Sequence, residues 1–141
     1  MDLGRTIDYI ETRPEFDKDR IAYYGFSMGA EQAIPAVAVE PRLKTAVFLS
    51  GGLFPYSPAE FPLPEVDPIN FLPRIRIPAL LLLGRNDFYY RVESAQRPFF
   101  ALLGTPPQDK RHVIFENAGH VPPRIDVIRE VLQWLDKYLG H

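Results

Sequence analysis

The residues best suited to chemistry surround a serine between two glycines, Gly25-Phe26-Ser27-Met28-Gly29, directly after the apolar run 21–24. A serine hydroxyl is a poor nucleophile, and it reacts well only when a tight turn presents it to a neighbouring base. The glycines at 25 and 29 are expected to let a strand and a helix approach closely enough to form that turn. The pattern predicts a strand, a turn that exposes Ser27, and a helix from Ser27 onward.

Two further residues supply the other groups that a serine hydrolase needs. Asp87 follows the apolar run 79–83, and His120 follows the predicted strand 111–116. An imidazole can take the Ser27 proton near neutral pH and return it to the leaving group, while a carboxylate fixes its tautomer. The backbone N–H of Met28, at the start of the helix, would bind the oxyanion with help from the helix dipole.

Other ionisable residues fit these roles less well. Asp67 and Glu93 are weaker choices for the acid, because neither directly follows a strand. His112 lies inside a predicted strand as a packed core residue, and His141 ends the chain. No two histidines have the spacing of metal ligands, so neither a metal nor another cofactor is expected.

Hydrophobic periodicity predicts helices alternating with strands. The expected strands are 21–24, 45–49, 79–83 and 111–116, and the expected helices are 2–12, 27–39 with a kink at Pro35, 91–103 and 125–139. Such alternation is typical of a parallel sheet, whose ligands bind beyond the carboxyl ends of the strands. The apolar stripe expected on the last helix consists of Ile125, Ile128, Leu132, Leu135 and Leu139.

Composition limits the class of protein. The chain has 141 residues, 46% hydrophobic and 24% charged, with a net charge of −2 and no cysteine. These values predict a single globular domain over residues 1–141, without disulfides or thiol catalysis. Basic residues are scattered, so a nucleic-acid partner is not expected. The absence of a leader signature and of a long apolar run predicts a cytoplasmic protein that does not bind membranes.

Aromatic residues near the predicted site bear on the substrate. Six of the fifteen prolines lie between residues 53 and 73, where no regular helix or central strand is expected. This loop is too short for a separate lid domain, which favours an open site for small or aryl esters. Phe26, Phe54 and Phe88 are the expected substrate-binding residues, although each could equally be a core residue beneath a long loop.

On these motifs the chain resembles the α/β-hydrolase superfamily, in its dienelactone hydrolase, acetyl xylan esterase and prolyl oligopeptidase branch. It is also similar to hydrolase domains attached to bacterial serine/threonine kinases. The matching segments are residues 2–9, 24–29, 78–87 and 119–120. The resemblance implies hydrolysis of carboxylic esters through an acyl-serine, with Ser27, Asp87 and His120 as the triad. Dienelactone hydrolases proper use cysteine, so serine favours esterase chemistry.

The resemblance covers only the C-terminal half of that fold, which implies a truncated α/β-hydrolase fold of about four parallel strands with flanking helices. The missing half normally supplies a second oxyanion N–H and neighbours for strand 20–24. An apolar edge invites pairing, so a homodimer through strand 20–24 and helix 2–12 is expected. The alternatives are an inactive or weak hydrolase remnant serving as an interaction module, and a peptidase of the prolyl-oligopeptidase type.

Overall fold

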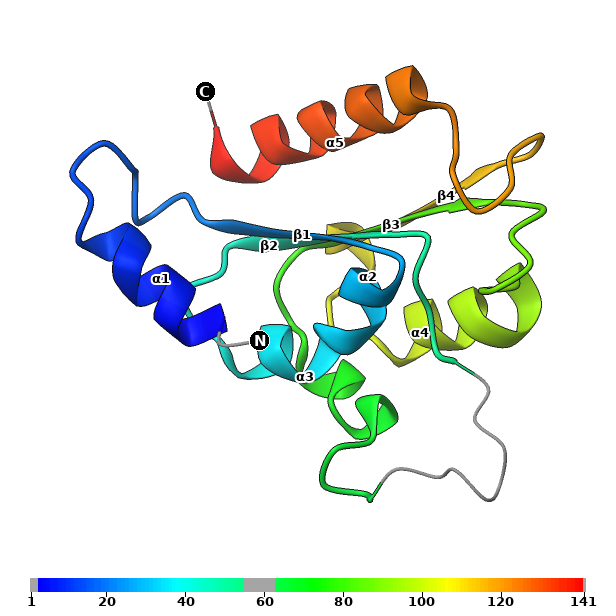
Figure 1. Ribbon diagram of the computed structural model, residues 1–141, viewed down its shortest axis with the longest axis horizontal. Coiled ribbons are helices and arrows are strands. Elements are labelled where there is room, and N and C mark those ends of the chain that lie inside the picture. The colour runs from blue at the N-terminus through cyan, green and yellow to red at the C-terminus, as the bar shows by residue number, and fades with distance from the viewer. Residues whose placement is uncertain (1–2, 55–62, 141) are drawn as a thin grey trace.

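The computed structural model describes residues 3–54 and 63–140, and its centre is a parallel sheet of four strands in the order β1-β2-β3-β4 (Figure 1). The strands are β1 (Ala22–Phe26), β2 (Thr45–Leu49), β3 (Ala79–Gly84) and β4 (Lys110–Phe115). In register, Tyr24 lies opposite Val47, Val47 opposite Leu80, and Leu80 opposite Arg111. The predicted four-stranded parallel sheet is confirmed, and the loops after β3 and β4 lie together at the right of Figure 1.

Helices cover both faces of this sheet. The long helix α5 (Arg124–Leu139) lies on one face, and on the other lie α1 (Leu3–Glu11), α2 (Met28–Gln32), α3 (Ile34–Val39) and α4 (Arg97–Leu102) (Figure 1). The side chains of β2 and β3 are buried throughout. Because both faces of these strands are covered, their sequences are nearly continuous apolar runs. Phe48, Leu81 and Phe99 belong to the core beneath the sheet, and Leu80 and Trp134 to the core under α5.

Two predicted helices are divided, each close to a proline. The predicted helix 27–39 consists of α2 and α3, which meet at Ala33, and Pro35 lies in the first turn of α3. The predicted helix 91–103 begins with a π-helical turn, η4 (Val92–Gln96), and Pro98 lies in the first turn of α4. A proline has no N–H to donate and its ring clashes with the preceding turn, so an α-helix readily begins there and rarely continues through it.

Proline also sets the short 3₁₀ turns of the remaining segments. These are η2 (Pro68–Asn70), η3 (Leu72–Arg74) and η5 (Pro107–Asp109). Two of them fall in the proline-rich stretch, and its described residues, 53–54 and 63–73, include no α-helix or strand, as predicted. Residues 55–62 of that stretch lie outside the described residues.

The apolar stripe predicted on α5 is wrong. Ile125, Ile128 and Leu132 are exposed by 65%, 40% and 55%, whereas Val127 and Trp134 are buried against the sheet. The indole N–H of Trp134 donates to the Thr45 hydroxyl at 2.7 Å, which fixes the orientation of the helix. Two apolar stripes lie side by side on this helix, and the stripe with the large aromatic ring is the buried one.

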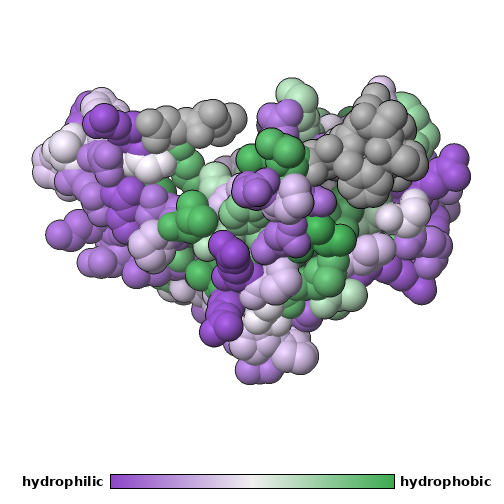
Figure 2. Space-filling model, turned by 90° about the horizontal axis from the view of Figure 1, so that it is seen from below, coloured by the Kyte–Doolittle hydropathy of each residue, from purple (hydrophilic) through white to green (hydrophobic). Residues whose placement is uncertain are grey.

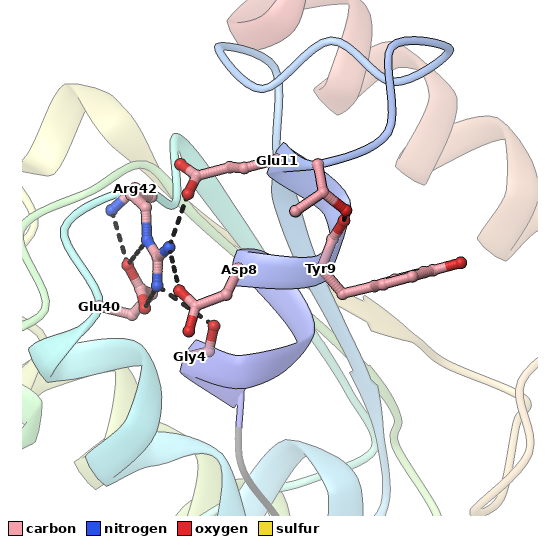
Figure 3. A network of polar contacts seen from close by, with 7 residues as sticks. Gly4, Asp8, Tyr9, Glu11, Glu40 and Arg42 are labelled. Carbon is pink, nitrogen blue, oxygen red and sulfur yellow. Dashed lines mark hydrogen bonds and ion pairs between the residues drawn. The ribbon is translucent and has the colours of Figure 1, made fainter.

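An arginine just before β2 joins α1 to the rest of the molecule (Figure 3). The guanidinium of Arg42 contacts Glu40 at 2.7 Å on one side, and Asp8 at 2.8 Å and Glu11 at 3.0 Å on the other. It also donates to the Gly4 carbonyl at 3.3 Å. The carboxylates of Glu40 and Asp8 hold the pKa of Arg42 above its ordinary value. This network holds α1 against the loop that enters β2.

Several large apolar side chains are exposed at the surface. Figure 2, seen from below, shows hydrophobic residues in the middle of the molecule and hydrophilic ones towards both ends. Strand β1 is at one edge of the described sheet, with Tyr24 exposed by 51% and Phe26 by 41%. The dimer through this edge stays a prediction. Within residues 3–54 and 63–140, no helix has the length and apolar character needed to cross a membrane.

His112 is a packed residue of β4, as the sequence predicts. Its ring stacks on Phe100 at 5.6 Å between centroids, and its Nε2 atom is buried with no hydrogen-bond partner among the described residues. Burial, together with the positive charges of Arg97 and Arg85, lowers the pKa of His112. Below about pH 6.5 the unfolded chain therefore binds a proton that the folded chain binds only at lower pH.

We expect His112 to make the protein less stable as the pH falls below about 6.5, and to have no such effect at higher pH. In His112→Phe, the ring still stacks on Phe100 but cannot titrate. The fall in thermal midpoint between about pH 7.5 and about pH 5.5 should thus be smaller in the variant than in the wild type, because the carboxylates contribute equally to both. Equal falls in the two proteins, measured by circular dichroism in matched buffers, would contradict this assignment.

Candidate functional site

Ser27 occupies a strained turn between β1 and α2. Its backbone has φ 54° and ψ −120°, a region that residues other than glycine rarely adopt. The Ser27 N–H donates to the Leu49 carbonyl at 2.8 Å, and the Ser27 carbonyl accepts from Ala30 at 2.9 Å and Glu31 at 3.2 Å. These bonds to β2 and to the first turn of α2 hold the serine in its unfavourable conformation and fix the direction of its side chain.

Of the two glycines beside Ser27, only Gly25 is required by close contact. A Cβ atom at Gly25 would lie 2.6 Å from the Gly29 carbonyl oxygen, whereas a Cβ at Gly29 would meet no heavy atom within 4 Å. The prediction that both glycines permit the approach is therefore correct at Gly25 and wrong at Gly29. The backbone of α2 passes over the α-carbon of Gly25, so the crowding falls on the strand side of the turn.

The structure brings Ser27, Asp87 and His120 together, although they come from three separate loops. The Nε2 atom of His120 lies 2.8 Å from Ser27 Oγ, and its Nδ1 atom lies 2.8 Å from Asp87 Oδ2. The Asp87 side chain is fully buried, and that of His120 is exposed by 16%. The three side chains form a continuous hydrogen-bonded chain from the buried Asp87 carboxylate to the hydroxyl of the half-buried Ser27.

A close crossing of two loops produces this alignment. A Cβ atom at Gly84 would lie 2.1 Å from the Gly119 carbonyl oxygen, so only glycine fits at the end of β3. Beyond it, the Asn86 N–H donates to the Ala118 carbonyl at 2.9 Å. The carboxylate of Asp87 is then held by two backbone donors, with Oδ1 accepting from Tyr89 at 2.8 Å and from Tyr90 at 3.1 Å.

Aromatic rings surround the His120 imidazole. Ring centroids lie at 5.3 Å for Phe26, 5.1 Å for Tyr89, 6.2 Å for Tyr90 and 6.3 Å for Phe88. Phe26 and Phe88 are exposed by 41% and 68%, so both present apolar surface to solvent beside the His120 imidazole.

The remaining predicted residues lie at varying distances from this centre. Phe54 packs edge-on against Tyr90 at 6.1 Å and so belongs to a second layer of aromatic rings. Met28 is the first residue of α2, directly after the serine. The weaker choices for the acid are engaged elsewhere, since Asp67 caps η2 through the Ile69 N–H and Glu93 forms an ion pair with Arg97.

Sequence analysis did not identify the contact between Tyr90 and Glu31. The Tyr90 hydroxyl donates to Glu31 Oε2 at 2.6 Å, and this bond joins the loop after β3 to α2. The only signal was the aromatic run that follows Asp87. In the part of the chain that the structure describes, no group of three or more histidine, aspartate or glutamate side chains is arranged to hold a metal ion.

A parallel sheet with helices on both faces and a serine on a strained turn from a strand into a helix are characteristic of the α/β-hydrolase fold. The chain has this fold. More narrowly, it belongs to the dienelactone hydrolase family, whose family model matches residues 1–121. The matched range contains Ser27, Asp87 and His120.

Solved structures share the fold at low sequence identity. A cold-adapted esterase from an Arctic intertidal metagenomic library is 24% identical with a TM-score of 0.75, and the match covers 98% of this chain and 57% of that one. An acetyl xylan esterase from Paenibacillus sp. R4 is 21% identical with a TM-score of 0.77, covering 96% and 50%. A thiohydrolase from Arthrinium phaeospermum is 34% identical over 56 residues, which are 40% of this chain and 18% of that protein. The chain spans about half the length of the solved structures it matches.

Proposed function

We propose that this protein is a serine carboxylesterase that cleaves small or aryl esters through an acyl-serine intermediate. The observation that carries the proposal is the position of the His120 imidazole, 2.8 Å from Ser27 Oγ on one side and 2.8 Å from Asp87 Oδ2 on the other. Membership of the dienelactone hydrolase family supports a hydrolase. The esterases among the solved structures of the same fold are consistent with ester substrates.

In the proposed first step, Ser27 Oγ attacks the ester carbonyl carbon while its proton passes to His120 Nε2. The carbonyl π electrons move to oxygen, which gives a tetrahedral oxyanion. When the oxyanion collapses, the bond to the leaving alcohol breaks and His120 returns the proton to that alcohol. Water then attacks the acyl-serine in the same way, with His120 as base, and releases the carboxylic acid.

Met28 is the proposed oxyanion donor. The first N–H groups of a helix have no partner within the helix, and Met28 opens α2 directly after the nucleophile. Such a donor acts mainly on the charge that develops in the transition state, and losing one donor typically costs about 10²–10³-fold in rate. The strained turn at Ser27 supports this role, because it fixes the direction of the following peptide N–H.

The aromatic surroundings of His120 favour a flat apolar group on the substrate. Phe26 and Phe88 are both exposed and lie within 6.3 Å of the imidazole, between ring centroids. An aryl leaving group can pack against such rings, and an offset or edge-on contact contributes about 0.5–1.5 kcal/mol beyond area burial. We therefore propose aryl esters with short acyl chains as the preferred substrates.

Thioesters are a second candidate substrate class, favoured by the 34% identity with a thiohydrolase over 56 residues. The same acyl-serine would form, with a thiol in place of the alcohol as leaving group. Comparing kcat/KM for phenyl acetate and S-phenyl thioacetate on one enzyme preparation separates the two classes.

Covalent labelling tests the proposal. Diethyl p-nitrophenyl phosphate should phosphorylate Ser27, because the serine oxygen displaces p-nitrophenolate from phosphorus while His120 accepts the serine proton. We expect one diethylphosphoryl group per chain, mapped to Ser27 by mass spectrometry, and loss of p-nitrophenyl acetate hydrolysis in proportion to labelling. The exposed Ser94 is an internal control and should stay unlabelled. No turnover above heat-denatured protein, or full turnover after complete labelling, would refute the proposal.

A further inference from the structure

Tyr90 contacts three separate parts of the site. It is exposed by only 5% and packs with Leu83, Val92 and Ala95 in a small core cluster. Its backbone N–H donates to Asp87 Oδ1 at 3.1 Å, its ring stacks on the His120 imidazole at 6.2 Å and 24°, and its hydroxyl donates to Glu31 Oε2 at 2.6 Å. One residue therefore supports the carboxylate, packs against the imidazole and contacts the helix that follows the nucleophile.

Glu31 transmits this contact to Ser27. Its own N–H donates to the Ser27 carbonyl at 3.2 Å, so the Glu31 backbone is part of the turn that carries the nucleophile. The Tyr90–Glu31 bond thus joins the Asp87 loop to the Ser27 turn along a route that does not pass through His120. A bond from a phenol to a carboxylate is charge-assisted, and it is shorter and stronger than a bond between neutral groups.

We propose that Tyr90 is a positioning residue, and that its bond to Glu31 sets the distance between the imidazole and the nucleophile. This inference rests on the proposed esterase function. The imidazole must accept a proton from Ser27 and deliver it to the leaving alcohol in one geometry, and a displacement of about 1 Å can cost about 10²-fold in rate. Removing the Tyr90 hydroxyl leaves the ring and the backbone donor in place, so the expected loss of rate is smaller than about 10²-fold.

A double-mutant cycle measures the role of this bond. We expect Tyr90→Phe to lower kcat about tenfold with KM changed less than about twofold, because alignment changes and substrate contacts do not. In the Glu31→Ala background, the same Tyr90→Phe change should lower kcat by less than about twofold, since the bond is already gone. Glu31→Gln keeps an acceptor oxygen and should retain more activity than Glu31→Ala.

The matched control removes a similar bond elsewhere. The Tyr138 hydroxyl donates to Asp109 Oδ1 at 3.1 Å and accepts from Lys137 Nζ at 2.7 Å. Tyr138 packs against the core under α5, outside the proposed site. Tyr138→Phe should leave kcat unchanged. Thermal midpoints of both variants, measured together with kcat at a temperature where both are fully folded, separate positioning from stability.

Three results would overturn the inference. Tyr90→Phe could keep kcat within about twofold of a wild type that shows Ser27-dependent turnover, in which case only the positioning role fails. Tyr90→Phe could lower kcat equally with and without Glu31, which would show that the bond does not carry the effect. A wild type without Ser27-dependent turnover would refute the esterase function itself, and the positioning role with it.

Discussion

Replacing Ser27 with alanine should lower ester turnover by at least about 10³-fold. The proposed mechanism forms its covalent bond through Ser27 Oγ alone, and alanine has no atom to replace it. The fold should survive, because the backbone bonds of residue 27 to Leu49, Ala30 and Glu31 do not involve the side chain. Initial rates with p-nitrophenyl acetate and butyrate measure the loss, and thermal melting of the same samples shows that the variant is folded.

Ser94→Ala is the matched control for this substitution. Ser94 is an exposed serine of η4 and takes no part in the hydrogen-bonded chain at Ser27. Its replacement should leave both ester rates within about twofold of the wild type. Equal rates in wild type and Ser27→Ala would mean that the observed hydrolysis does not use this serine, and the esterase proposal would then be wrong.

The sheet could be predicted from sequence because its central strands are buried on both sides. A strand such as β3 is apolar at every position when helices cover both faces, and short runs of this kind are recognisable without any structure. Parallel strands in chain order also place their carboxyl ends at one edge. The positions of Ser27, Asp87 and His120 directly after strands were therefore enough to predict that the three residues lie close together.

Local patterns were less informative about helices. The apolar run of 27–39 does not show that a second helix begins near Pro35. A proline is compatible both with a kink in one continuous helix and with the first turn of a new helix. On α5, two adjacent stripes are both apolar, and periodicity cannot choose between them. The choice depends on Trp134, whose indole N–H finds the Thr45 hydroxyl on β2, 89 positions away in the chain.

The contacts that hold the site residues in place could not be predicted from local sequence patterns either. The Tyr90–Glu31 bond joins residues 59 positions apart, and neither residue stands in a recognisable motif with the other. Likewise, the need for glycine at Gly25 but not at Gly29 depends on which backbone passes over which α-carbon. Residue types predict which chemistry is available, whereas long-range packing decides how firmly each group is held.

Asp87→Asn should lower kcat by about 10³-fold to 10⁴-fold while the protein stays folded. Oδ1 of Asp87 accepts two backbone N–H bonds, from Tyr89 and Tyr90, so the amide oxygen of asparagine must take that position. Its NH₂ group then faces His120 Nδ1, where Oδ2 stood at 2.8 Å. The imidazole must therefore accept at Nδ1 and carry its proton on Nε2, which leaves no acceptor for the Ser27 proton.

The conservative change at a nearby exposed acid distinguishes this tautomer effect from a general loss of negative charge. Glu93 lies six positions after Asp87, and its side chain is exposed by 67% in an ion pair with Arg97. Glu93→Gln removes the same charge without facing the imidazole, so kcat should stay within about twofold of the wild type. If Asp87→Asn were as active as Glu93→Gln, with both proteins folded, the carboxylate at 87 would have no part in orienting His120. The hydrogen bond between them would then be structural only.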